Sequence, residues 1–170
     1  MESRVKLLGH PVHPMLIVFP LGLLSTAVIF DVLYLVTGND ELAIFAFWAI
    51  AAGIVGGLAA AIFGLIDWLA IPRDTRAKGV GLTHGIGNVV IVGLFAVSWL
   101  LRLDNPVYGD NLLPFVLALI GAGLALFTAW LGGELVYRLR VAVDDGANLD
   151  ASNSLTASGV AEVTDARPRS

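Results

Sequence analysis

Four long apolar blocks, separated by short polar segments, dominate the pattern of this chain. A stretch of about 20 apolar residues is long enough to cross the hydrocarbon core of a bilayer as a helix. None of the blocks shows the alternation of apolar and polar residues that is typical of barrel strands. The pattern therefore predicts four membrane-spanning helices, at about residues 14–36, 42–71, 80–101 and 112–139.

The predicted helices form one all-α domain, residues 1–143. Short connections between the first and second helices, and between the third and fourth, make each pair antiparallel neighbours. Small residues allow the close backbone approach on which packing in lipid depends. Two helices carry them along one face, at Gly53, Gly57, Ala60 and Gly64 and at Gly121, Ala125, Ala129 and Gly133. We expect a compact four-helix transmembrane bundle without a wide pore.

The distribution of charge predicts the orientation of the bundle. Charged residues make up 14% of the chain, against about 25% in soluble domains. Nine of the ten lysines and arginines flank the same ends of the predicted helices, and Arg102 alone lies on the other side. Loops rich in lysine and arginine stay in the cytoplasm. Both termini are therefore predicted to be cytoplasmic, in a bacterial inner membrane.

Several classes of function find no support in the residues. The chain has no cysteine, which excludes disulfides, iron–sulfur clusters and thiolate metal sites. It has no phosphate-binding loop and no nucleophile elbow, so we assign no catalytic residue and do not expect an enzyme. The basic residues are too few and scattered to bind nucleic acid. The last segment, residues 144–170, is polar and lacks aromatic residues, and is predicted to be disordered.

Ionisable residues gather at one level of the predicted bundle. Successive helices run in opposite directions, so the end of one helix and the start of the next lie on the same side. The residues placed there, on the cytoplasmic side, are His10, His13, Asp67, His84, Asn88, Glu134 and Arg138. Asp31 lies near the opposite face, because each helical residue rises about 1.5 Å. Ionisable residues at such depths are candidates for function.

Structural roles can also explain these residues. Polar side chains and aromatic residues are common at the membrane interface. Glu134 and Arg138 can form an ion pair along one helix, since they are four residues apart. Asp67 can pair with Arg73 or Arg76.

Four segments resemble a known bacterial membrane family. The opening "GHPVHPMLIVFPLGLL", Gly9–Leu24, and the later "GLIDWLAIP", "LTHGIGN" and "WLGGELVYR" are similar to the blocks of domain of unknown function 2231. The resemblance covers about residues 5–143 and implies a four-helix membrane protein without an assigned activity. Relatives fused to Rieske-type or cytochrome c domains imply a role near electron transfer. Many members have further histidines where this chain has Val18 and Leu139.

The leading hypothesis is a membrane-embedded redox or metal-binding protein with His10, His13 and His84 as ligands. In one version two of the histidines hold haem b. In the other, the histidines and Asp67 or Glu134 bind a transition metal, and Asn88, Arg138 or the carboxylates orient the ligands. The alternative is a cofactor-free structural or accessory subunit. A proton relay is less favoured, because no charge is expected at mid-depth. The expected partners are the lipid bilayer, and a membrane redox protein or a second copy of the chain.

Overall fold

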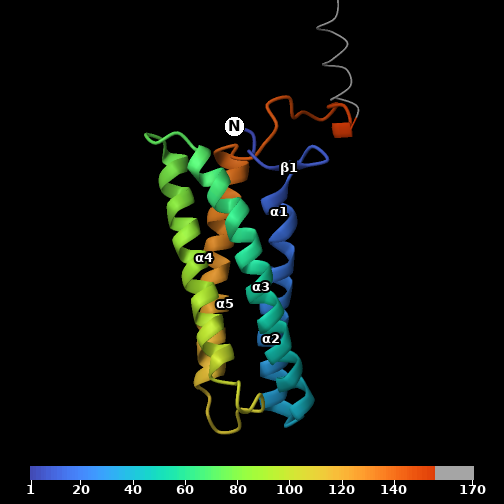
Figure 1. Cartoon of the computed structure of the whole chain (residues 1–170), viewed down its shortest axis with the longest axis vertical. Coiled ribbons are helices and arrows are strands. Elements are labelled where there is room, and N and C mark those ends of the chain that lie inside the picture. Colours follow the sequence, from blue (N-terminus) through green and yellow to red (C-terminus); the bar gives the residue numbers. More distant parts are fainter. Residues whose placement is uncertain (156–170) are drawn as a thin grey trace, which may run out of the picture.

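Four long apolar helices run side by side in the computed structural model, which describes residues 1–155 (Figure 1). The first consists of α1 (Val12–Leu16) and α2 (Val18–Thr37). It is followed by α3 (Asp40–Ala70) and α4 (Arg76–Leu100). The last, α5 (Leu113–Gly133), continues into the π-helix η1 (Glu134–Arg138). All four are long and apolar enough to cross a membrane. The predicted all-α bundle is confirmed.

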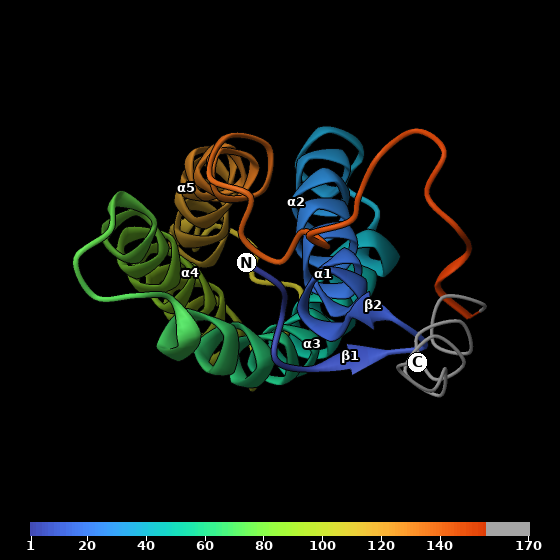
Figure 2. The same cartoon turned by 90° about the horizontal axis from the view of Figure 1, so that it is seen from above.

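The helices surround a common axis in the order α2, α3, α4 and α5, as the view along the bundle shows (Figure 2). The most extensive packing is between α2 and α3 and between α4 and α5, and α3 also packs on α4. The bundle is thus made of two antiparallel helical hairpins, as the short connections predict.

A short β-hairpin precedes the first helix. Its strands, β1 (Lys6–Leu7) and β2 (His10–Pro11), are antiparallel, with Leu7 opposite His10. Leu8 and Gly9 form the turn and both have positive φ, 52° and 83°, as tight hairpin turns require. The observed start of the first helix is close to the predicted residue 14, but His10, which was grouped with the residues at the helix ends, lies outside the helix. His10 belongs to the second strand, and the helix begins only at Val12.

Proline explains the interruption between α1 and α2. Pro20 has no N–H to donate to the carbonyl of Leu16, four residues earlier. The helical hydrogen bonds continue on either side, from Ile17 N to His13 O and from Leu21 N to Ile17 O. The first span therefore continues through the break at Ile17 as one helical rod.

The two hairpins repeat one arrangement. One constant offset along the sequence relates His13 to His84 and Asp31 to Arg102, and a slightly shorter offset relates α3 to α5. Several residues that are buried in the middle of one hairpin are buried at the equivalent place in the other. These pairs are Leu24 and Phe95, Ala27 and Ser98, Asp31 and Arg102, Ala46 and Pro114, Ile50 and Ala118, Gly53 and Gly121, and Ala60 and Thr128.

The contacts inside each hairpin repeat as well. A Cβ atom added to Gly53 would lie 2.5 Å from Leu24, and one added to Gly121 would lie 2.9 Å from Phe95. Each glycine thus makes room for a large side chain at the equivalent position of the helix before it. Both hairpins start at the same end of the bundle, so the repeat is a direct one about an axis along the bundle.

The chain after η1 returns over the end that carries the N-terminus (Figure 1). Residues 144–155 form turns without a long helix or strand. Residues 156–170, the greater part of the tail predicted to be disordered, lie outside the described residues.

Candidate functional site

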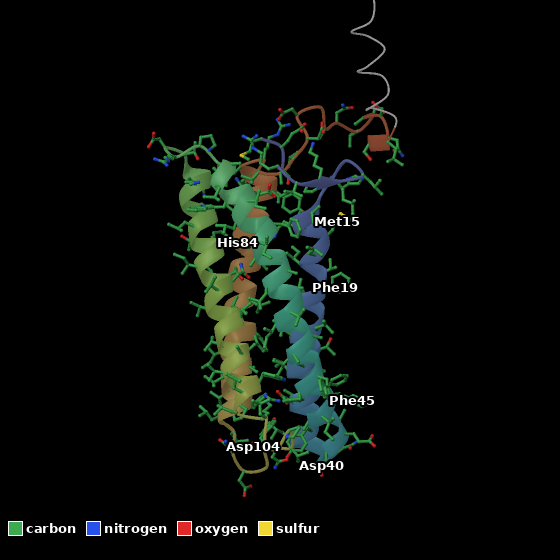
Figure 3. All side chains as sticks on the ribbon, in the orientation of Figure 1. Met15, Phe19, Asp40, Phe45, His84 and Asp104 are labelled. Atoms are coloured by element: carbon green, nitrogen blue, oxygen red, sulfur yellow. The ribbon has the colours of Figure 1, made fainter. Side chains whose placement is uncertain are left out.

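Two polar layers lie inside the bundle, one toward each end. Figure 3 shows His84 toward the end that carries the N-terminus, and Asp104 at the opposite end. We call the first the histidine end, defined by His13 and His84. We call the second the ion-pair end, defined by Asp31 and Arg102.

His13 is held against α3. Its Nδ1 lies 2.9 Å from the main-chain oxygen of Ala60. Because a carbonyl oxygen only accepts hydrogen bonds, Nδ1 carries the hydrogen and donates it. The ring lies over Gly64, where an added Cβ would be 2.9 Å from the Cε1 atom of the imidazole. The glycine, one helical turn after Ala60, is what allows the ring to approach the backbone of α3.

His84 is held against α5 in the same way. Its Nδ1 donates to the main-chain oxygen of Thr128 over 2.9 Å. The ring lies near Gly132, where an added Cβ would be 3.3 Å from Cε1. The amide nitrogen of Asn88 lies 3.2 Å from His84 Nε2 and donates to the His84 carbonyl oxygen over 2.7 Å. Asn88 therefore supports His84 from one turn further along α4.

The two imidazoles share one tautomer and an equivalent place in the repeat. With the hydrogen on Nδ1, each Nε2 has a lone pair directed away from the helix that holds the ring. Both rings are half-buried. Of the residues that the sequence singled out, these two are the histidines that the structure brings into the bundle.

His10 does not join them. It is exposed, in β2, and its Nε2 lies 3.4 Å from the hydroxyl oxygen of Ser154 in the C-terminal segment. The β-hairpin that carries it lies above the start of α1, at the end of the bundle that carries the N-terminus (Figure 1). The candidate ligands of the three-histidine hypothesis therefore reduce to a pair.

Asp67 binds the N-terminal segment instead of an arginine. Both of its carboxylate oxygens lie 2.8 Å from the Ser3 hydroxyl, and Oδ1 also accepts from the main-chain N–H of Arg4 over 2.8 Å. The side chain is buried. The expected pairing with Arg73 or Arg76 is not found among the described residues. Asp67 fixes the approach of the chain to β1.

Glu134 pairs between helices and not along its own. Its carboxylate accepts from Arg76 at the start of α4, over 2.6 Å. Arg138, expected as its partner, is exposed. The reason is the π-helical turn: the main-chain bond runs from Leu139 N to Glu134 O, one residue further than in an α-helix, so residues four apart are no longer aligned.

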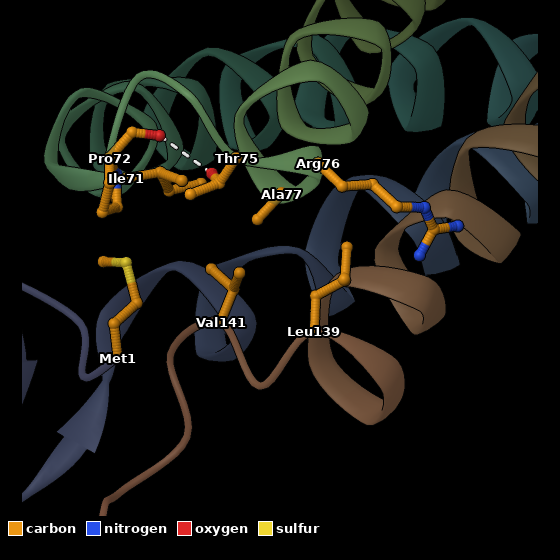
Figure 4. A pocket seen from close by; sticks show the side chains of 8 residues that line it. All are labelled: Met1, Ile71, Pro72, Thr75, Arg76, Ala77, Leu139 and Val141. Atoms are coloured by element: carbon orange, nitrogen blue, oxygen red, sulfur yellow. Dashed lines mark hydrogen bonds between the residues drawn. The ribbon is translucent and has the colours of Figure 1, made fainter.

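A small apolar pocket lies at the surface of the histidine end. Met1, Ile71 and Val141 line it, with the α3–α4 turn on one side and the chain after η1 on the other (Figure 4). The N-terminal amine donates to the Arg140 carbonyl oxygen over 3.0 Å. Met1 thus packs against the residues at this end of the bundle.

The two versions of the redox hypothesis need different numbers of ligands from the chain. Among residues 1–155, no group of three or more histidine, aspartate or glutamate side chains is placed to hold a metal ion. Asp67 and Glu134 are engaged by Ser3 and Arg76. A haem iron needs only two axial side chains from the protein. His13 and His84 are the two histidines that lie within the bundle.

The ion-pair end was missed by sequence reasoning as a site. Arg102 donates to both carboxylate oxygens of Asp31, over 2.7 and 2.8 Å, and both side chains have no exposed surface. Arg102 also donates to Ser98 Oγ over 3.1 Å, and Ser98 donates to the Pro114 carbonyl oxygen. The Tyr108 hydroxyl lies 3.3 Å from Asp31. A bidentate pair of this kind is among the strongest hydrogen-bonded contacts in proteins.

Tyr108 closes this layer from the α4–α5 loop. Its ring lies 4.6 Å from the guanidinium carbon of Arg102 and packs edge-on against Tyr34. Burial, and then the negative charge of Asp31, raise the pKa of the Tyr108 phenol. The tyrosine therefore stays neutral and donates its hydrogen to the carboxylate.

Four apolar spans with a polar layer toward each end define a multi-pass membrane protein. The chain belongs to the family described as "Predicted membrane protein (DUF2231)", whose model matches residues 9–145. The resemblance drawn from the Gly9–Leu24 opening is thereby confirmed. Neither the curated proteins nor the solved structures include a match to the chain.

Proposed function

We propose that the protein is a haem-binding electron-transfer component of the membrane, in which His13 and His84 would hold the haem iron. One observation carries the proposal: the two rings are fixed by the same hydrogen bond, from Nδ1 to a main-chain oxygen of the neighbouring helix. Histidine ligands commonly donate their second ring N–H to such a partner, which sets the tautomer and the ring orientation. Nε2 is then the nitrogen left to bind iron.

The residues around the pair have distinct parts in this proposal. Ala60 and Thr128 accept the Nδ1 hydrogens, and Gly64 and Gly132 let the rings lie on the neighbouring helices. Asn88 holds His84 Nε2 and would release it on ligation. Haem, when bound, supplies one-electron exchange. The chain supplies two neutral nitrogens at equivalent positions of its two hairpins.

In this proposal the site lies near the cytoplasmic face. The supporting feature is charge: Arg102 is buried at the ion-pair end, and the histidine end carries a set of arginines, Arg4, Arg73, Arg76, Arg138 and Arg140. Basic loops remain cytoplasmic during insertion. A redox partner would then exchange electrons with the protein from the cytoplasmic side. Cysteines introduced singly at Arg138 and Asp104 test this: a reagent that cannot cross the membrane should label only the second in intact cells.

A second candidate is a cofactor-free accessory subunit. It is favoured by the Asn88 amide, which already occupies the lone pair of His84 Nε2. In that case the histidines act as helix clamps, each joining a hairpin through one hydrogen bond and one close contact with glycine. In both candidate functions His13 and His84 have equivalent structural roles. Only in the first do they bind a cofactor.

An absorption spectrum of the detergent-purified protein from a haem-replete host separates the two. The haem proposal predicts a Soret band that shifts on reduction with dithionite and is lost in His84→Ala. His10→Ala is the matched control, because His10 is exposed in the hairpin, and it should retain the band. A featureless spectrum of the folded wild-type protein would leave the accessory subunit.

A further inference from the structure

We infer that the Asp31–Arg102 pair specifies which helical hairpins assemble, so that α2 and α3 combine with α4 and α5 and not with a second copy of themselves. The inference concerns the ion-pair end and holds whether or not the histidines bind a cofactor. The partner of each hairpin is defined by chemistry: a hairpin that carries the opposite charge at the equivalent position of the repeat.

The two charges occupy one position of the repeat. Asp31 follows His13 at the same distance along the sequence as Arg102 follows His84. Both side chains are fully buried, and the two carboxylate oxygens meet the two terminal guanidinium nitrogens. Equivalent positions of two related hairpins meet each other when the hairpins pack about a shared axis. Asp31 and Arg102 are therefore one point at which equivalent positions of the two hairpins meet.

The apolar packing inside the two hairpins is similar. Leu24 and Phe95, deeper in the bundle than each charged residue, are both large and apolar, and each lies over a glycine, Gly53 or Gly121. Related surfaces of this kind favour pairing with copies as well as with each other. In lipid, apolar contacts between helices carry little discrimination, since the tails are equally apolar.

The charges supply the missing discrimination. Two copies of the first hairpin would bring two buried aspartates together, and two copies of the second would bring two arginines together. Like charges in a buried interface disfavour the wrong complex strongly. The correct complex has one of each, joined by two hydrogen bonds. A buried polar contact that fixes pairing is the best-attested use of such groups.

The test uses the natural lack of cysteine in the chain. Ala27, buried one turn before Asp31, is replaced by cysteine as the only thiol. Pairing of like hairpins from two chains would bring two such thiols together. A membrane-permeant bifunctional thiol reagent then yields a covalent dimer, which is quantified on a denaturing gel.

We expect little dimer from Ala27→Cys alone. Adding Asp31→Leu and Arg102→Leu removes both charges without leaving one unpaired, and we expect the dimer to increase by about tenfold or more. The exchanged pair Asp31→Arg with Arg102→Asp restores opposite charges and should return the dimer to a low level. The exchanged variant also provides a test if the leucine variant does not fold. In that case we expect the exchanged variant to yield more folded protein than Asp31→Arg alone.

Two results would overturn the inference. One is a leucine variant that folds and gives no more dimer than Ala27→Cys alone, which would mean that apolar packing fixes the pairing. The other is an exchanged variant that behaves no better than Asp31→Arg alone, which would mean that the position of each charge matters and the repeat does not make them equivalent.

Discussion

The two ends of the bundle use polar side chains in opposite ways. At the ion-pair end, Asp31 and Arg102 are charged, fully buried and bound to each other. At the histidine end, His13 and His84 are held by main-chain oxygens of neighbouring helices. The first arrangement neutralises its charges within the protein. The second fixes two imidazole rings through Nδ1, and Asn88 also contacts the Nε2 atom of His84.

Under the proposed function, this difference separates the end that stabilises the bundle from the end that would hold haem. A buried charge without a partner is very costly in lipid, so an ion pair at equivalent positions of the two hairpins holds them in register. A neutral imidazole fixed through Nδ1 costs much less and remains available as a ligand. Substitutions that weaken one end of the bundle at a time test this comparison.

The largest effect is expected from removal of one partner of the ion pair. Arg102→Leu leaves Asp31 buried without a cation and should lower the free energy of unfolding by about 3–5 kcal/mol. Thermal unfolding in detergent measures the loss. Arg73→Leu is the control, because Arg73 is exposed and its charge is solvated. The double variant Asp31→Leu with Arg102→Leu should be much closer to wild type; a double loss equal to the sum of the single losses would contradict the pairing.

The close contact between glycine and imidazole gives the next effect. Gly64→Ala would bring a methyl group within 2.9 Å of the His13 ring, which should cost about 1–3 kcal/mol. Gly132→Ala should cost less, because its methyl group would lie 3.3 Å from His84. Gly22→Ala is the control, since nothing lies within 4 Å of that Cβ. Unfolding curves in which Gly132→Ala costs more than Gly64→Ala would show that the rings are not held as described.

A smaller effect is expected where the N-terminal segment meets Asp67. Ser3→Ala removes the hydroxyl that donates to Asp67 and should cost about 1 kcal/mol. The local consequence is easier access to the chain before β1, so trypsin should cleave after Arg4 faster than in wild type. Ser25→Ala, at an exposed position of α2, should leave the cleavage rate unchanged.

The smallest effect concerns pH at the ion-pair end. The pKa of Tyr108 is raised in the folded protein by burial and by Asp31. Above the ordinary tyrosine pKa of about 10 the unfolded chain loses this proton and the folded protein keeps it. The contribution is therefore complete below a pH of about 10 and is lost as the pH rises further. Tyr108→Phe should make the fall in stability at higher pH shallower; an unchanged slope would contradict the burial of the phenol.

Much of the architecture could be predicted because lipid constrains it. Block length and apolarity predict four helices, and short connections predict the two hairpins. The small residues of α3 and α5 do make close contacts, as Gly53 and Gly121 show. The first helix starts at Val12, close to the predicted residue 14, but the β-hairpin before it, with positive φ at Leu8 and Gly9, was not predicted.

The polar partners were harder to predict. Glu134 was expected to pair with Arg138, four residues away, but the π-helical turn and the approach of α4 give it Arg76. The sequence places Asp31 near the far face of the membrane and Arg102 in a loop, and nothing in their local sequence pairs them. The signal that could have joined them is the repeat, because each follows a histidine of an apolar helix at the same spacing. Few identical residues mark that repeat in the sequence. The burial of equivalent residues in the structure makes it recognisable.

The most direct test of the account compares the two ends in one measurement, the reduced-minus-oxidised absorption spectrum. We predict that Asp31→Leu with Arg102→Leu retains the haem spectrum of the wild type, because its histidines keep their places. We predict that His13→Ala and His84→Ala each lose it while remaining folded. A spectrum that survives both histidine variants, or a folded wild type with no haem band, would contradict the assignment of chemistry to the histidine end.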